Sequence, residues 1–273
     1  MKRVTAGIVF IVALSAFAFR EDRTALAQID KRDESRLRVY NHEAFKRGEV
    51  LNYRLHYGWI DAGIINIEVK DEAREIGGRK TFHIVGVGES KGTFDFFFKV
   101  RDRYESYIDE EAMVPWIFIR RVNEGGFIIN QDYIFNHYKK KVDIGNNTTF
   151  DVPEYCQDMI SAFYFARCMD YSKAKEGDVF TINGFVDKEV FPIKIRYVGK
   201  ETIETDVGKV NCIKFRPILQ KGRIFKHEED LNVWITNDKN HIPVRAQAKI
   251  LVGSVKMDLI GYSNIANPLA LEK

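Results

Sequence analysis

"VLNYRLHYGW", residues 50–59, alternates apolar and polar side chains. Leu51, Tyr53 and Leu55 share one face, whereas Asn52 and Arg54 share the other. An alternation of period two is typical of a half-buried β-strand, because successive side chains of a strand point to opposite faces. The same alternation recurs at residues 65–70, 193–197, 231–235, 244–250 and 255–259.

Turn signals separate these stretches. They include Gly77-Gly78, Gly125-Gly126, Asp206-Val207-Gly208 and Asn237-Asp238. Short strands joined by tight turns indicate antiparallel pairing. We therefore expect an all-β fold, an antiparallel meander forming a deformed barrel or a two-sheet sandwich, in a single β-rich domain over residues 28–273.

One segment, "DVPEYCQDMISAFYFARCM" at residues 151–169, has helical spacing instead. It predicts one helix from about 153 to 170, which would divide the strands into two groups or halves, either crossing between two sheets or plugging the end of a barrel. Asp158, Ser161 and Arg167 are its polar side chains. We expect them to tie the helix to the sheets by hydrogen bonds; the alternative is that they face a ligand.

The N-terminus has the parts of a signal peptide over residues 1–27. Met1-Lys2-Arg3 is basic, residues 4–19 are apolar, and Ala25-Leu26-Ala27 matches an A-x-A cleavage site. We expect export to the periplasm or cell surface of a Gram-negative bacterium, with no transmembrane span after cleavage. The alternative is an uncleaved anchor, although the apolar run is short for a span.

Charge narrows the range of partners. Removing residues 1–27 takes away four basic and two acidic side chains, so the formal charge falls from +3 to +1. A nearly neutral chain argues against a broad electrostatic footprint for nucleic acid or anionic lipid. The expected partner is a lipid, a glycan or another envelope protein.

Three cysteines are few for an exported protein that depends on disulfides. Cys156 and Cys168 are separated by about 18 Å within the predicted helix, too far to pair with each other. Cys212 could pair with either of them. The alternative is that all three are buried thiols.

The stretch "GVGESKGTFDFFFKV", residues 86–100, contains the G-x-S-x-G pattern of serine hydrolases at Ser90. A nucleophile elbow needs a helix directly after the serine, and we predict a hairpin loop at 89–92 followed by a strand. Phe94, Phe96 and Phe98 would then fill the core. We expect no catalytic residue, and a serine hydrolase using Ser90 is the least favoured alternative.

Four aromatic side chains are the candidate wall of a ligand-binding groove. Phe97 points opposite to its phenylalanine neighbours in the predicted strand, and with Tyr107, Trp116 and Phe118 it could line a groove. The alternative is that these rings belong to the core. No cofactor and no metal site are predicted, because the histidines lack zinc spacing and no phosphate-binding loop is present.

Three further motifs run through the chain in a fixed order. The first comprises Gly48, Glu49, Leu51, Tyr53, Ala62 and Gly63; the second, Asp158, Ser161, Tyr164 and Arg167; the third, Trp234, Thr236, Asp238, Pro243 and Val244. With these motifs the chain resembles the exported bacterial proteins grouped as domain of unknown function 3108. The resemblance implies an envelope protein with a meandering antiparallel sheet, and it brings no established activity.

Together these features predict a non-enzymatic periplasmic or cell-surface protein that binds an apolar or saccharide envelope component in a groove. The alternative is a scaffold or assembly partner that docks another envelope protein through exposed aromatics and strand edges.

Overall fold

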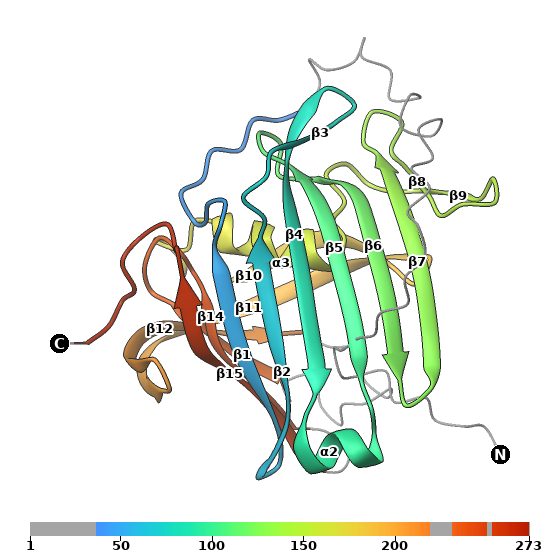
Figure 1. The fold of residues 1–273 in the computed structure, drawn as a ribbon. Helices are drawn as coiled ribbons and strands as arrows, with labels where there is room; N and C mark the ends of the chain where they lie inside the picture. Colours follow the sequence, from blue (N-terminus) through green and yellow to red (C-terminus); the bar gives the residue numbers. More distant parts are fainter. Residues whose placement is uncertain (1–36, 219–230, 250–252, 273) are drawn as a thin grey trace.

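The computed structural model describes residues 37–218, 231–249 and 253–272. The predicted signal peptide and its cleavage site lie outside these ranges. In the described residues, fifteen strands form one antiparallel sheet that curves around a helix (Figure 1). The all-β antiparallel meander is therefore confirmed, with a barrel-like sheet that does not close.

The sheet runs in the order β10-β11-β12-β13-β14-β15-β1-β2-β4-β5-β6-β7-β8-β9, and β3 pairs with β4 off this path. Its first half in sequence is β1 (Val50–Tyr57), β2 (Ile60–Val69), β3 (Arg74–Ile76), β4 (Arg79–Ser90), β5 (Arg101–Asp109), β6 (Pro115–Glu124), β7 (Phe127–Asn136), β8 (Lys141–Asp143) and β9 (Thr149–Asp151). The second half is β10 (Val179–Val186), β11 (Glu189–Thr205), β12 (Gly208–Pro217), β13 (Leu231–Thr236), β14 (Pro243–Lys249) and β15 (Ser254–Ser263).

β1 joins the two halves of the sheet, because it pairs with β2 on one side and with β15, the last strand, on the other. Leu51, Tyr53 and Leu55 are buried and the residues between them are half-buried, as the alternation predicts. One continuous sheet thus carries both groups of strands, with the apolar faces turned inward.

The predicted helix exists as α3 (Met159–Cys168), but its predicted start at about 153 was wrong. Asp158 caps the helix by accepting the backbone N–H groups of Ile160 and Ser161, and the Ser161 hydroxyl accepts the N–H of Asp158. The residues before this capping box form a turn at Glu154 and Tyr155, where Tyr155 has a φ of +56°, and then a β-bridge at Gln157. Gln157 exchanges backbone hydrogen bonds with Asn183 and Phe185 of β10 instead of joining the helix.

The stretch after Ser90 also differs from the prediction. A short helix, α2 (Gly92–Phe97), replaces the predicted hairpin loop and strand, and β5 begins at Arg101. Gly92 has a φ of +56°, which a glycine adopts readily. Asp95 is then drawn back to Ser90 by a hydrogen bond, which favours a helical turn over continued strand.

The interior contains two large hydrophobic clusters. One packs α3 against the inner face of β4–β8 and includes Cys156; the other lies under β1, β2 and β12–β15 and includes Cys212. Cys168 is half-buried beside the first cluster. All three cysteines are free thiols, and burial raises the pKa of each to about 12.

Candidate functional site

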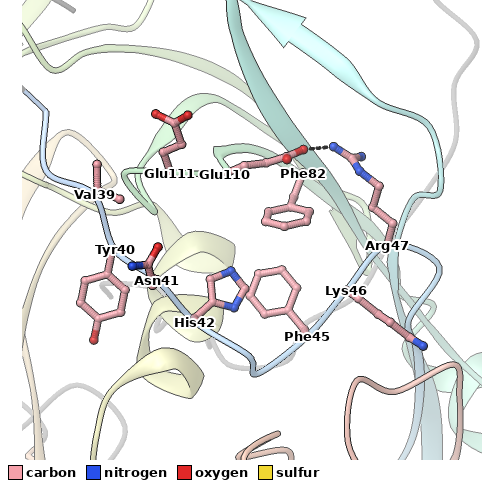
Figure 2. Close-up of a pocket in the computed structure, with 10 residues that line it drawn as sticks. All are labelled: Val39, Tyr40, Asn41, His42, Phe45, Lys46, Arg47, Phe82, Glu110 and Glu111. Atoms are coloured by element: carbon pink, nitrogen blue, oxygen red, sulfur yellow. Dashed lines mark hydrogen bonds and ion pairs between the residues drawn. The ribbon is translucent and has the colours of Figure 1, made fainter. Parts of the chain in front are cut away.

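An open depression lies at the end of the sheet where β4 begins. Its volume is about 610 Å³. Three parts of the chain enclose it: the segment before β1, the start of β4 and the turn from β5 to β6 (Figure 2). Its lining residues are Val39, Tyr40, Asn41, His42, Phe45, Lys46, Arg47, Phe82, Glu110 and Glu111.

Aromatic rings form one wall of the depression. The His42 ring stacks on Phe45 with 4.5 Å between ring centroids, and Phe45 lies 4.9 Å from Phe82 (Figure 2). Phe45 is buried, whereas His42 and Phe82 are half-exposed. Packing from below therefore holds the wall rigid, and part of its ring surface remains available to a ligand.

Charged groups form the rim. Arg47 donates to the carbonyl oxygens of Glu72 at 2.6 Å and Thr81 at 2.9 Å and forms an ion pair with Glu110. Glu111 pairs with Arg79 at 3.2 Å, and Lys46 is exposed. The rim thus combines fixed cationic and anionic groups, an arrangement that can hydrogen-bond a ligand rich in hydroxyl groups.

His42 has a polar atom without a partner. Its Nδ1 is buried and has no hydrogen bond within the described part of the chain. Burial, and the nearby Arg167 charge, lower the pKa of His42 to about 4, so the imidazole is neutral at pH 7. A buried nitrogen without a partner costs free energy, and its lack of accessible surface keeps Nδ1 out of reach of a ligand in the depression.

A buried ion pair supports the wall from below. Arg167 on α3 donates to both carboxylate oxygens of Glu49, at 2.6 Å and 2.8 Å, and both side chains are almost fully buried. Arg167 also donates to the carbonyl oxygen of Ala44 at 3.1 Å, and Tyr164 donates to Glu49 at 3.3 Å. These bonds fix the segment that carries His42 and Phe45 onto the helix.

The turn that carries the third sequence motif contacts the same Arg167–Glu49 ion pair through Arg167. Arg167 Nε donates at 3.0 Å to the carbonyl oxygen of Asn240, in the turn between β13 and β14. Thr236 and Asp238 shape that turn, because their side chains bond to each other at 2.7 Å and to backbone N–H groups within it. Glu49 of the first motif, Tyr164 and Arg167 of the second, and the turn shaped by the third therefore meet in one buried network.

Asp158 anchors the other end of α3. Its carboxylate accepts the Ser106 hydroxyl of β5 at 2.6 Å in addition to its helix-capping bonds. The prediction that polar side chains tie the helix to the sheet is confirmed for Asp158 and Arg167, whereas Ser161 bonds to Asp158 within the capping box.

The four residues predicted to line a ligand groove are not brought together. Phe97 is 77% exposed on α2, whereas Tyr107 and Trp116 lie in a small buried cluster and Phe118 lies in the main core. Phe97 leaves the sheet because its segment is helical, and Tyr107 and Phe118 fall on opposite faces of paired strands. The hypothesis of a shared wall is corrected accordingly.

The rings that do line the depression were missed by sequence reasoning. Residues 39–47 have neither period-two nor helical spacing, so no pattern distinguishes them from an ordinary loop. The one available signal was that this aromatic segment directly precedes the Gly48-Glu49 motif.

Ser90 is placed without the partners of a catalytic serine. It is 2% exposed, its hydroxyl donates to Asp95 at 2.5 Å, and it accepts the Val100 N–H at 2.8 Å. Within the described ranges no histidine hydrogen-bonds to it. The strands on both sides of it are antiparallel, whereas a nucleophile elbow belongs to a parallel α/β sheet.

Within residues 37–218, 231–249 and 253–272, no group of three or more histidine, cysteine or acidic side chains is arranged to hold a metal ion. No helix in these ranges is long and apolar enough to cross a membrane.

A comparison with protein families matches residues 52–260 to the model described as "Protein of unknown function (DUF3108)". A search of curated proteins finds no match.

Solved structures with a similar fold include the β-barrel-like protein of domain of unknown function DUF1849 from Brucella abortus. It is 10% identical with a TM-score of 0.52, and the match covers 80% of this chain and 98% of that one. A DUF1089 family protein from Pseudomonas aeruginosa is 8% identical with a TM-score of 0.40, over 69% and 90% of the two chains. The Mycobacterium tuberculosis lipoprotein LppX is 14% identical with a TM-score of 0.19, over 82% and 89%. Of these three, the Brucella structure is the one similar enough to establish a shared fold, and it says nothing about activity.

Proposed function

Since the chain belongs to the family of unknown function DUF3108, which brings no activity with it, we propose from the site itself that this is an exported, non-enzymatic protein that binds a saccharide component of the cell envelope. The observation that carries the proposal is the depression of about 610 Å³ walled by His42, Phe45 and Phe82. The expected signal peptide over residues 1–27 supports export.

The shape of the depression favours a sugar over an acyl chain. A buried acyl chain needs an enclosed apolar cavity, whereas this site is open and has a charged rim. Ring faces pack well against the C–H face of a sugar, and a rim of charged groups can bond its hydroxyls. Lys46 and Glu110 supply a donor and an acceptor for that purpose.

A non-enzymatic role fits the surroundings of the groups usually found in hydrolases. Ser90 is buried at the far end of β4 from the depression, bonded to Asp95 and Val100. In the depression itself, Glu110 pairs with Arg47 and Glu111 with Arg79, so both carboxylates have structural partners.

Calorimetric titration tests the proposal. The mature chain, residues 28–273, would be titrated with soluble peptidoglycan fragments and with lipopolysaccharide core oligosaccharide. We expect binding of one of these probes, weakened about tenfold in His42→Ala by the loss of one stacking face. His56→Ala is the matched control, because His56 lies near the other end of the strands.

Two outcomes would contradict the proposal. One is that neither probe binds. The other is that His42→Ala binds as tightly as the unmodified chain. Recovery of a fixed protein partner from the envelope, without glycan binding, would instead favour a scaffold.

A further inference from the structure

Exposed apolar side chains gather at the end of the sheet opposite the depression. We call this group the tip patch: Trp59, Ile60, Phe96, Phe97, Phe98, Phe127 and Ile128. Trp59 is 91% exposed, Phe96 87% and Phe97 77%. All exposed phenylalanine and tryptophan side chains of the described ranges belong to it. Such concentration differs from the scattered exposure that is normal on a protein surface.

Three neighbouring turns carry the tip patch. Figure 1 shows α2 and the β1–β2 and β6–β7 turns together at the lower end of the sheet. Lys91 N donates to the carbonyl oxygen of Ala62 at 3.0 Å, which joins α2 to β2. Gly125 N donates to Lys99 O at 2.8 Å, and a Cβ on Gly125 would lie 2.7 Å from the Phe98 ring. The turns therefore form one continuous surface.

The short helix α2 packs only loosely against the rest of the chain. None of its six residues is buried, and so short a helix has little stability without packing. Phe94 packs against the second hydrophobic cluster, whereas Phe96 and Phe97 face solvent, edge to face at 5.3 Å. The exposure of Phe96 and Phe97 is therefore unexplained by the packing of the chain itself.

We propose that the tip patch docks the protein on a lipid bilayer by inserting the aromatic side chains of these turns into the interface. The patch consists of protruding turn tips, a shape that suits a penetrable surface. Tryptophan and phenylalanine are the side chains that favour the headgroup boundary.

The charged side chains on and beside α2 also suit docking on a lipid bilayer. Lys91 and Lys99, both exposed, flank α2 and would face headgroup phosphates. Asp95, the acidic residue of α2, is neutralised by Arg101 through bonds of 2.6 Å and 3.0 Å. With only two such lysines, the binding energy must come mainly from the rings, in keeping with a nearly neutral chain. The proposal does not depend on the saccharide site, which lies at the other end of β4.

Sedimentation with vesicles tests the docking. We expect the mature chain to sediment with vesicles of phosphatidylethanolamine and phosphatidylglycerol, and more weakly with phosphatidylcholine alone. Phe96→Ser/Phe97→Ser should lower the partition coefficient roughly tenfold or more, because it removes two exposed rings without touching the core. Val179→Ser/Val190→Ser, at exposed positions on β10 and β11, is the matched control and should bind as the unmodified chain does.

Tryptophan fluorescence gives a second measurement of docking on vesicles. Trp59 is exposed whereas Trp116 and Trp234 are buried, so a blue shift on adding vesicles would report Trp59. Trp59→Phe should lose the shift and keep most of the sedimentation.

Three results would overturn the proposal: no sedimentation with either vesicle, equal binding by Phe96→Ser/Phe97→Ser, or a concentration-dependent dimer that this variant abolishes. The last would assign the tip patch to a second copy of the chain.

Discussion

Replacing Arg167 with methionine should destabilise the protein severely. Arg167 is 2% exposed and donates two hydrogen bonds to Glu49 and two to backbone carbonyl oxygens. Arg167→Met keeps much of the apolar stem but leaves the Glu49 carboxylate, itself 0% exposed, without its counter-charge. Removing one partner of a buried pair costs about 3–5 kcal/mol of unfolding free energy.

Urea unfolding at pH 7, followed by circular dichroism, measures that loss. Arg121→Met is the matched control: Arg121 pairs with Asp132 at 2.6 Å on the surface, and such pairs contribute about 0–1 kcal/mol. The double variant Glu49→Leu/Arg167→Met should recover part of the loss, because it leaves no buried charge. A loss below about 1 kcal/mol in Arg167→Met, or no recovery in the double variant, would refute the reasoning.

Three further outcomes are expected. Burial raises the pKa of Asp158 to about 6. Protonation of Asp158 therefore stabilises the fold at low pH, and this contribution is lost as the pH rises from about 4 to about 6. Asp158→Asn should flatten the pH dependence of the urea unfolding midpoint across that window. Ser90→Ala should lose about 1–2 kcal/mol of unfolding free energy by leaving the Val100 N–H unpaired, with no change in p-nitrophenyl acetate hydrolysis, and an activity that vanished would restore the hydrolase hypothesis. Gly63→Ala should lose about 1–3 kcal/mol in the same unfolding assay, because the new Cβ would overlap the carbonyl oxygen of Glu89, and an unchanged midpoint would contradict that contact.

Local patterns predicted strands such as β1 because one face of the strand is more buried than the other. β1 alternates cleanly, and its burial follows that alternation, whereas its pairing with the distant β15 does not. The helix was found for the same reason, but its start depended on Gln157 pairing with β10, a contact with residues more than twenty positions away. Long-range pairing of this kind leaves no local signal.

The stretch 94–98 misled the prediction because four of its five residues are phenylalanine. A run that is apolar on every face fits a strand and a helix equally well. The bond from Ser90 to Asp95, which favours the helix, becomes visible only in the structure. The sequence did not predict the depression for a related reason. Its wall comes from an irregular segment that is held in place by Glu49 and Arg167.

The central claim is that the depression beside His42 binds an envelope saccharide. The most direct measurement is a backbone amide NMR spectrum of the isotope-labelled mature chain, recorded while core oligosaccharide or soluble peptidoglycan fragments are added. We predict shifts confined to residues 40–47, Phe82 and the turn at 110–111. No saturable shifts with either probe, or shifts elsewhere in the sheet, would contradict the account.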